Sequence, residues 1–182
     1  MAVLEGIGLI VGPTFSPQMT SKQFRRRFPD DDACKAYLVA RRWPTGIRCA
    51  RCNNPRVYSD NNRPFHWQCT ACAIKGGYRF SVLVGTIFEN ASTGLRIWFE
   101  VIRLIVINED RISAAEIHRL VGFGGYDTIR IMSHRIRIAL TDPAFCNLMG
   151  IAEIDGPPED APGSGRARRE AKSSESRRSK SI

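Results

Sequence analysis

Four cysteines carry the chemistry that the sequence offers most clearly. Cys49, Cys52, Cys69 and Cys72 form two C-x-x-C pairs, with sixteen residues between the pairs. A two-residue gap lets both thiolates of one pair turn toward one metal ion, and a second pair completes a tetrahedron around Zn²⁺. A thioredoxin-type redox motif is single and lies in a βαβ pattern, so two pairs disfavour a redox role. We therefore predict a structural Zn²⁺ site with these four thiolates as its ligands.

Three other residues with metal-binding chemistry are predicted to stay outside this site. Cys34 and Cys146 lie in apolar sequence, which favours buried, inert thiols. His66 lies between the two pairs but outside their spacing, and four thiolates already close a structural zinc site. We expect His66 to be a surface or stacking residue.

The charge of the chain points to a polyanionic partner. The 182 residues carry a formal net charge of +9, with a pI near 9.7. Such an excess favours nucleic acid, because lysine and arginine bind phosphates and release counterions; a merely solvated basic surface is the alternative. No apolar run approaches the length that spans a bilayer, and the apolar start lacks the basic region and cleavage site of a signal peptide.

Short strands and a helix are expected around the cysteines. Residues 56–58, 65–68 and 78–84 show the pattern of short strands, and so small a sheet cannot bury enough apolar area to fold alone. Zinc supplies the difference, on the order of 10–16 kcal/mol in small zinc modules. Before the ribbon, residues 30–32 are three aspartates that suit the start of a helix. By their three- and four-residue spacing, Cys34, Tyr37, Leu38 and Arg41 are expected to fall on one face of that helix.

Residues 91–140 show helical periodicity. The first helix has an apolar stripe for the core, made of Leu95, Trp98, Phe99, Ile102 and Ile105. Its other side is expected to carry Arg96, Glu100 and Arg103. Ser113 and Glu116 then fit a capping box, and the buried face of the helix that follows is expected to hold Ile117, Leu120 and Val121.

A glycine turn at residues 122–125 leads into a further predicted helix, residues 126–140. A helix with an apolar back and a basic front after a tight turn suits the DNA major groove, although many such helix pairs are only structural. The residues predicted to face DNA are Tyr126, Thr128, Arg130, His134 and Arg137.

These patterns together predict an α+β chain with a small four-cysteine zinc ribbon (short antiparallel strands) flanked by helices. A helix-turn-helix-like bundle and a disordered basic tail follow. The expected segments are a disordered N-terminal tail (1–15), a helical lead-in (16–46), the zinc ribbon (47–88), the helix-turn-helix-like region (91–141), a remnant strand (150–156) and the basic tail (157–182).

The order of the motifs resembles a family of mobile-element proteins. The series runs through Phe28-Pro29-Asp30-Asp31-Asp32-Ala33-Cys34, Trp43-Pro44, the four cysteines, Phe80-Ser81, Gly85-Thr86-Ile87-Phe88-Glu89, Leu95-Arg96, Trp98-Phe99, Ile112-Ser113-Ala114 and His134-Arg135-Ile136-Arg137. In this order they resemble bacterial insertion-sequence transposases of the ISXO-like family, which begin with a zinc ribbon. The resemblance implies a bacterial cytoplasmic, nucleoid-associated protein that binds double-stranded DNA at terminal inverted repeats.

In that family an RNase H-like domain follows, whose acidic residues hold two metal ions. Glu153-Ile154-Asp155 matches the first strand of such a domain, and the resemblance makes Asp155 the remnant of its first catalytic aspartate. Gly156 then stands in place of an acidic residue, and two prolines follow. Two-metal phosphoryl transfer needs several fixed carboxylates, so we expect no catalytic divalent metal and no activity of this chain alone.

We expect a truncated or frameshifted transposase, and its status as an enzyme stays open. Two alternatives remain at this stage: a zinc-ribbon helix-turn-helix regulator, and a zinc module for protein contacts. The Glu153-Ile154-Asp155 match disfavours the regulator, and the net positive charge disfavours the protein-contact module. Whether the chain forms a homo-oligomer is open as well.

Overall fold

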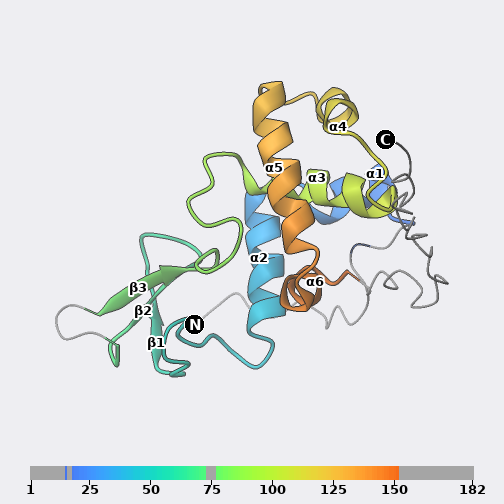
Figure 1. Cartoon of the computed structure of the whole chain (residues 1–182). Coiled ribbons are helices and arrows are strands. Elements are labelled where there is room, and N and C mark those ends of the chain that lie inside the picture. Colours follow the sequence, from blue (N-terminus) through green and yellow to red (C-terminus); the bar gives the residue numbers. More distant parts are fainter. Residues whose placement is uncertain (1–14, 16–17, 73–76, 152–182) are drawn as a thin grey trace, which may run out of the picture.

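The structure, a computed structural model, describes residue 15, residues 18–72 and residues 77–151 (Figure 1). Within them it contains six helices and one three-stranded antiparallel sheet, which confirms the predicted α+β class. The predicted remnant strand with Asp155 and the predicted basic tail lie outside the described residues. The sheet forms one end of the molecule, and helices α2 to α6 gather beside it.

Two helices precede the ribbon, and both begin at a side-chain cap. Helix α1 (Ser21–Arg27) starts at a capping box between Thr20 and Gln23. Helix α2 (Asp31–Arg42) starts at Asp30, whose carboxylate accepts the N–H of Ala33 at 2.8 Å. Of the residues predicted to share one face of α2, Cys34, Tyr37 and Leu38 are buried and Arg41 is partly buried.

The sheet consists of β1 (Val57–Ser59), β2 (His66–Cys69) and β3 (Tyr78–Ser81), in that order. Neighbouring strands are antiparallel, with Tyr58 opposite Gln68 and Gln68 opposite Arg79. The last strand ends at Ser81, three residues before the predicted end. Thr86 binds the carbonyl of Leu83 through both its N–H and its hydroxyl, so the chain turns there instead of extending.

Helix α3 (Leu95–Ile107) is the central helix and is covered on nearly every side. Arg103 was expected on its polar side; this expectation is wrong, because Arg103 is only 4% exposed. Its guanidinium pairs with Glu100 at 2.6 Å, donates to the carbonyl of Met19 and lies over the ring of Phe24. Helix α1 and the residues just before it therefore cover the side of α3 that periodicity assigned to solvent.

Helices α4 (Ala114–Val121) and α5 (Tyr126–Ala139) pack against each other and against α3. Ser113 caps α4 by accepting the N–H of Glu116, as predicted, and Gly122 ends it with φ +63°, a conformation that glycine adopts without strain. Ile117 is fully buried, but Leu120 is 60% exposed. The prediction that Leu120 belongs to the buried face is wrong, because α4 turns that residue to the surface.

Helix α6 (Pro143–Met149) was not predicted. Asp142 caps it, Pro143 occupies its first turn, and Gly150 ends it at φ +62°. The hydroxyl of Tyr37 donates to the carbonyl of Met149 at 2.8 Å, which ties α6 to α2. An Asp-Pro pair, with a glycine seven residues after the proline, is a recognisable signal for a helix start and end. This signal could have predicted α6 from the sequence.

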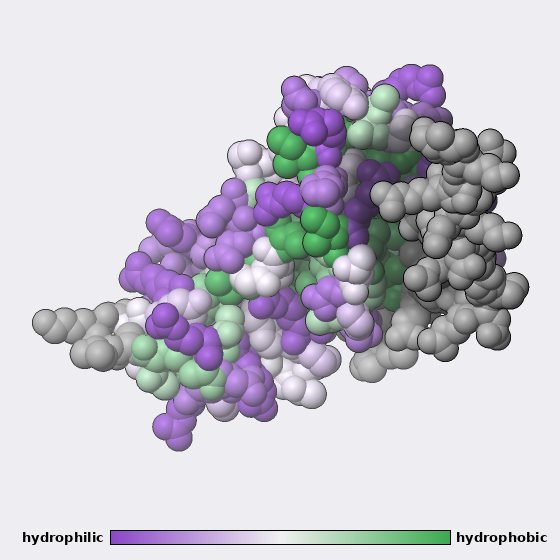
Figure 2. Space-filling view, in the orientation of Figure 1, coloured by the Kyte–Doolittle hydropathy of each residue, from purple (hydrophilic) through white to green (hydrophobic). Residues whose placement is uncertain are grey.

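Phenylalanines form the centre of the helical core. Phe99 contacts the rings of Phe15, Phe28, Tyr37 and Phe88, with ring centroids 5.0–5.9 Å apart. Phe15 was assigned to the N-terminal tail, yet it is buried here and forms a bridge with Ile151. On the outside, hydrophilic side chains cover much of the surface, and apolar patches interrupt them over α5 (Figure 2). Ile131 and Ile138 of α5 are more than half exposed.

Candidate metal centre and nucleic-acid interface

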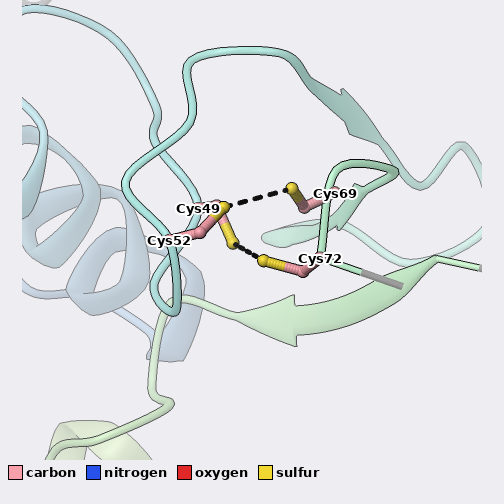
Figure 3. Close-up of side chains that lie close together, drawn as sticks. All are labelled: Cys49, Cys52, Cys69 and Cys72. Atoms are coloured by element: carbon pink, nitrogen blue, oxygen red, sulfur yellow. Dashed lines mark hydrogen bonds between the residues drawn. The ribbon is translucent and has the colours of Figure 1, made fainter. Parts of the chain in front are cut away.

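The four predicted ligands meet at one point. Their sulfur atoms all lie within 4.8 Å of one another, where the loop before β1 meets the end of β2 and the turn that follows it (Figure 3). The sulfurs of Cys49 and Cys72 are 3.6 Å apart, and those of Cys52 and Cys69 are 3.8 Å apart. Cys49 and Cys52 come from the loop before β1, whereas Cys69 ends β2 and Cys72 lies in the turn that follows.

This geometry fits zinc. A tetrahedral ion with Zn–S bonds of about 2.3 Å places its ligand sulfurs about 3.8 Å apart. The backbone N–H of Arg51 points at the sulfur of Cys49 at 3.4 Å, a bond that favours a thiolate. Four soft sulfur ligands form a closed structural site with no open coordination position. The donor set therefore fits structural Zn²⁺, held by Cys49, Cys52, Cys69 and Cys72.

The thiols of this site influence one another. Burial opposes ionisation of Cys49, but the backbone N–H donors of Cys52 and Arg51 outweigh it and lower the pKa of Cys49 to about 7. Hydrogen bonding with Cys52, aided by burial, raises the pKa of Cys72 above its ordinary value. Several thiolates so close together repel one another, and a divalent cation removes that repulsion.

Cys34 and Cys146 lie apart from the metal site, as predicted. Burial raises the pKa of the Cys34 thiol to about 12, so this thiol stays protonated and inert at neutral pH. Cys146 is half-buried, and its thiol donates to the carbonyl of Leu140 at 3.3 Å. His66 is partly exposed on β2, and its Nδ1 lies 3.0 Å from the carbonyl of Pro64.

Aromatic contacts fix the ribbon to α2. Trp43, the residue that ends α2, packs its ring edge-on against Trp67 of β2 and Phe80 of β3, with centroids 5.4 and 6.1 Å apart. Arg42 donates to the carbonyl of Val82, just after β3. The metal site is thereby held at a set position relative to the helices.

Most of the predicted DNA-facing residues of α5 are accessible. Tyr126, Thr128, Arg130 and His134 are all exposed, and the predicted apolar back of the helix is buried, formed by Ile129, Met132 and Ile136. Arg130 lies 3.3 Å from the carboxylate of Asp127 on the same helix, an exposed pair that a stronger partner can displace. The outer face of α5 thus presents polar side chains directly after the glycine turn.

Arg137 is placed differently from the other four residues. Its guanidinium binds the carboxylate of Asp110 and donates to the carbonyl of Ile112 at 2.7 Å. These contacts attach α5 to the turn between α3 and α4. Arg137 therefore already has a structural role in positioning the helix pair.

One contact in the turn was not found from the sequence. The Nε2 atom of His118 lies 3.0 Å from the carbonyl of Gly124, and its ring packs edge-on against Tyr126. This contact braces the first residue of α5 against α4. His118 lies six residues before Gly124, a separation that helical periodicity alone does not connect.

Comparison with known proteins supports the ribbon. Residues 29–74 match the family described as the transposase zinc-ribbon domain, a span that holds α2, the first two strands and all four cysteines. The chain thus carries a transposase-type zinc ribbon. No curated protein and no solved structure matches the chain. Among the described helices, none has both the length and the apolar character needed to cross a membrane.

Proposed function

We propose that this chain is the DNA-binding N-terminal part of an insertion-sequence transposase of the ISXO-like kind. It binds double-stranded DNA at terminal inverted repeats, in the cytoplasm and in association with the nucleoid. The match of residues 29–74 to the transposase zinc-ribbon domain carries the proposal, because this module precedes the helix pair and transposases act on DNA. The charge of +9 supports a phosphate-rich partner.

In this proposal α4 and α5 form a helix-turn-helix, with α5 in the major groove. Tyr126 and Thr128 lie in the first turn of α5, where recognition helices approach base edges. Arg130 follows one turn later, and its exchangeable contact with Asp127 leaves it able to bind a guanine edge. His134 extends the same exposed face, and Arg137 holds the helix pair in place beside the DNA backbone.

A binding titration tests this assignment. Duplexes selected from a random pool by the wild-type protein serve as probes, at two salt concentrations. Arg130→Ala should weaken binding to the selected duplex by about 1–3 kcal/mol and relax base preference at one position. Arg111→Ala is the matched control, since this side chain is 84% exposed and lies in the turn before α4.

Two outcomes would contradict the proposal. One is an Arg130→Ala variant with unchanged affinity and base preference. The other is wild-type affinity that does not fall with salt, because phosphate contacts must weaken as salt rises.

We also propose that these 182 residues do not by themselves cleave or join DNA. Asp155 is the one residue that matches the catalytic carboxylates of the family, and Gly156 with two prolines follows it. A strand-transfer assay with Mg²⁺ or Mn²⁺ and the selected duplex checks this. Cleaved or joined product above a protein-free control would overturn it.

A further inference from the structure

One face of the zinc-ribbon sheet presents an exposed tyrosine, Tyr58, and an exposed arginine, Arg79, to solvent. The pairing of the strands places Tyr58, Gln68 and Arg79 directly opposite one another, so their side chains lie in one row on the same face. We call this row, together with His66, the outer sheet face. The opposite face carries Trp67 and Phe80, which pack against the end of α2.

The outer sheet face presents an aromatic ring to solvent. Tyr58 is 64% exposed, the highest value among the large hydrophobic side chains of the described residues that are exposed. His66 lies on the same face, diagonally across from Tyr58, at a separation of about 7–8 Å for such pairs. Two flat rings therefore stand on this face within reach of one bound group.

Positive charge predominates in the described part of the ribbon. The described part of the ribbon, residues 47–72 and 77–88, contains one acidic residue, Asp60. It contains five arginines, all exposed: Arg48, Arg51, Arg56, Arg63 and Arg79. A Zn²⁺ ion with four thiolates carries two negative charges, so the ribbon stays positive with the metal bound. An anionic partner is favoured over a neutral or basic one.

The Gln68 side chain in this row lies close to the backbone at Gly77. Gly77 lies beside Gln68, and a Cβ atom at Gly77 would come within 2.3 Å of the Gln68 amide nitrogen. The absence of a side chain at Gly77 leaves room for the Gln68 amide, and Gln68 itself is paired with Tyr58 on one side and Arg79 on the other. Tyr58 and Arg79 are two strand spacings apart, about 10 Å, with a polar amide between them.

We propose that the outer sheet face binds single-stranded DNA, with an unpaired base stacked on Tyr58 and an adjacent phosphate on Arg79. A tyrosine ring on a flat surface offers its π-face, and a base exposes its own π-face only when it leaves the duplex stack. Arginine supplies charge for the backbone without selecting a sequence. The proposal shares with the proposed function only the choice of DNA as partner, and it uses a different surface.

The test compares two probes: a fixed DNA duplex, and the same duplex with a short single-stranded thymine extension. The zinc-loaded, full-length chain should bind the extended probe more tightly at equal salt. Tyr58→Ala should abolish that gain, a loss of roughly 5- to 100-fold on the extended probe, and leave duplex affinity unchanged. Tyr58→Phe should keep the gain, because it keeps the ring.

Matched variants separate stacking from charge and from folding. Arg48→Gln removes the same charge as Arg79→Gln but lies beside the metal site, outside the row. Because each variant loses one positive charge, both should weaken the salt-dependent electrostatic part of binding to either probe. Only Arg79→Gln should also reduce the gain in affinity that the single-stranded extension gives. Tyr58→Leu keeps an apolar side chain but removes the ring, and one bound zinc per chain confirms that it folds. Like Tyr58→Ala, it should lose the gain in affinity from the single-stranded extension.

The outcomes distinguish this inference from the proposed function. Arg130→Ala should weaken binding to both probes equally and leave intact the gain in affinity from the single-stranded extension. A wild-type protein that binds both probes equally overturns the inference and leaves the duplex proposal standing. A protein that binds the extension but no duplex supports the inference and contradicts the duplex proposal. A gain that survives Tyr58→Ala also overturns the inference.

Discussion

The ribbon and the helical bundle place their aromatic residues in different settings. In the bundle, Phe99 lies at the centre of a group of rings and is fully buried. In the ribbon, Trp67 and Phe80 cover one face of a sheet of three short strands, and Tyr58 stands exposed on the other. The helices of the bundle bury apolar side chains on several sides, and this burial stabilises the bundle. The sheet of the ribbon buries apolar side chains on one face only, so the ribbon depends on another source of folding free energy.

That source is the metal, with α2 as a secondary support. Zinc binding contributes folding free energy directly in small modules, because an unfolded chain offers no preformed site. The bundle has no such need, since its helices bury apolar side chains on several sides. The comparison implies that the two regions respond differently to the same perturbations, which three experiments can measure.

Zinc removal should have the largest effect, and its effect should be confined to the ribbon. Cys69→Ser, or a strong chelator, should unfold the ribbon through a loss on the order of 10 kcal/mol of binding free energy. Far-UV circular dichroism should retain most of its helical signal, and the fluorescence of Trp43 and Trp67 should shift as both become solvated. Zinc release, measured colorimetrically, should give one equivalent from the wild type.

Cys34→Ala is the matched control for this experiment. It also removes a thiol, but from the bundle core, so it should retain one equivalent of zinc. A Cys69→Ser protein with full zinc content would contradict the four-thiolate site. Loss of the entire helical signal on chelation would contradict the independence of the bundle.

Phe99→Ala should have an intermediate effect, and on the bundle alone. Removing this buried ring should cost about 3–5 kcal/mol, because the neighbouring rings cannot close the cavity. Urea unfolding followed by far-UV circular dichroism gives the free energy, and zinc content should not change. Phe123→Ala, at a 43% exposed position, should change stability by less than about 0.5 kcal/mol.

The smallest effect should come from a polar group inside the bundle. Ser133 is fully buried on α5, and its hydroxyl has no hydrogen-bond partner within the described part of the chain. Ser133→Ala should stabilise the protein by up to about 1 kcal/mol, because it removes an unsatisfied buried group. The midpoint of thermal unfolding measures this change.

Ser113→Ala offers a comparison of opposite sign. Its hydroxyl caps α4, so the same substitution there should cost about 1 kcal/mol. A Ser133→Ala variant that loses as much stability as Ser113→Ala would show that the buried hydroxyl is satisfied.

The two regions also differ in how far their sequences predicted them. In the ribbon, the spacing of four cysteines defined the metal site and the position of the strands, because metal geometry is local. In the bundle, periodicity found α3, α4 and α5 but misplaced Arg103 and Leu120. Burial at those positions depends on which distant segment covers the helix, and periodicity holds no information on that.

The candidate DNA-facing residues show the same limit. Charge and spacing selected Arg130, His134 and Arg137 as equivalent. Arg137, however, is engaged by Asp110 and Ile112, residues more than twenty positions away in the sequence. A sequence pattern identifies which arginines lie on one face of a helix, but the partners of each depend on the tertiary fold.

The attachment of the ribbon to α2 through Trp43 has a consequence for DNA geometry. A flexible linker would let the ribbon and α5 find their contacts independently, at almost any separation along the DNA. Because Trp43 and Arg42 fix the ribbon, the two surfaces have one separation and one relative angle. If both bind the same molecule, the unpaired segment must begin at a set number of base pairs from the α5 site. Shifting it by half a helical turn would place it on the wrong side of the duplex, where avidity is lost.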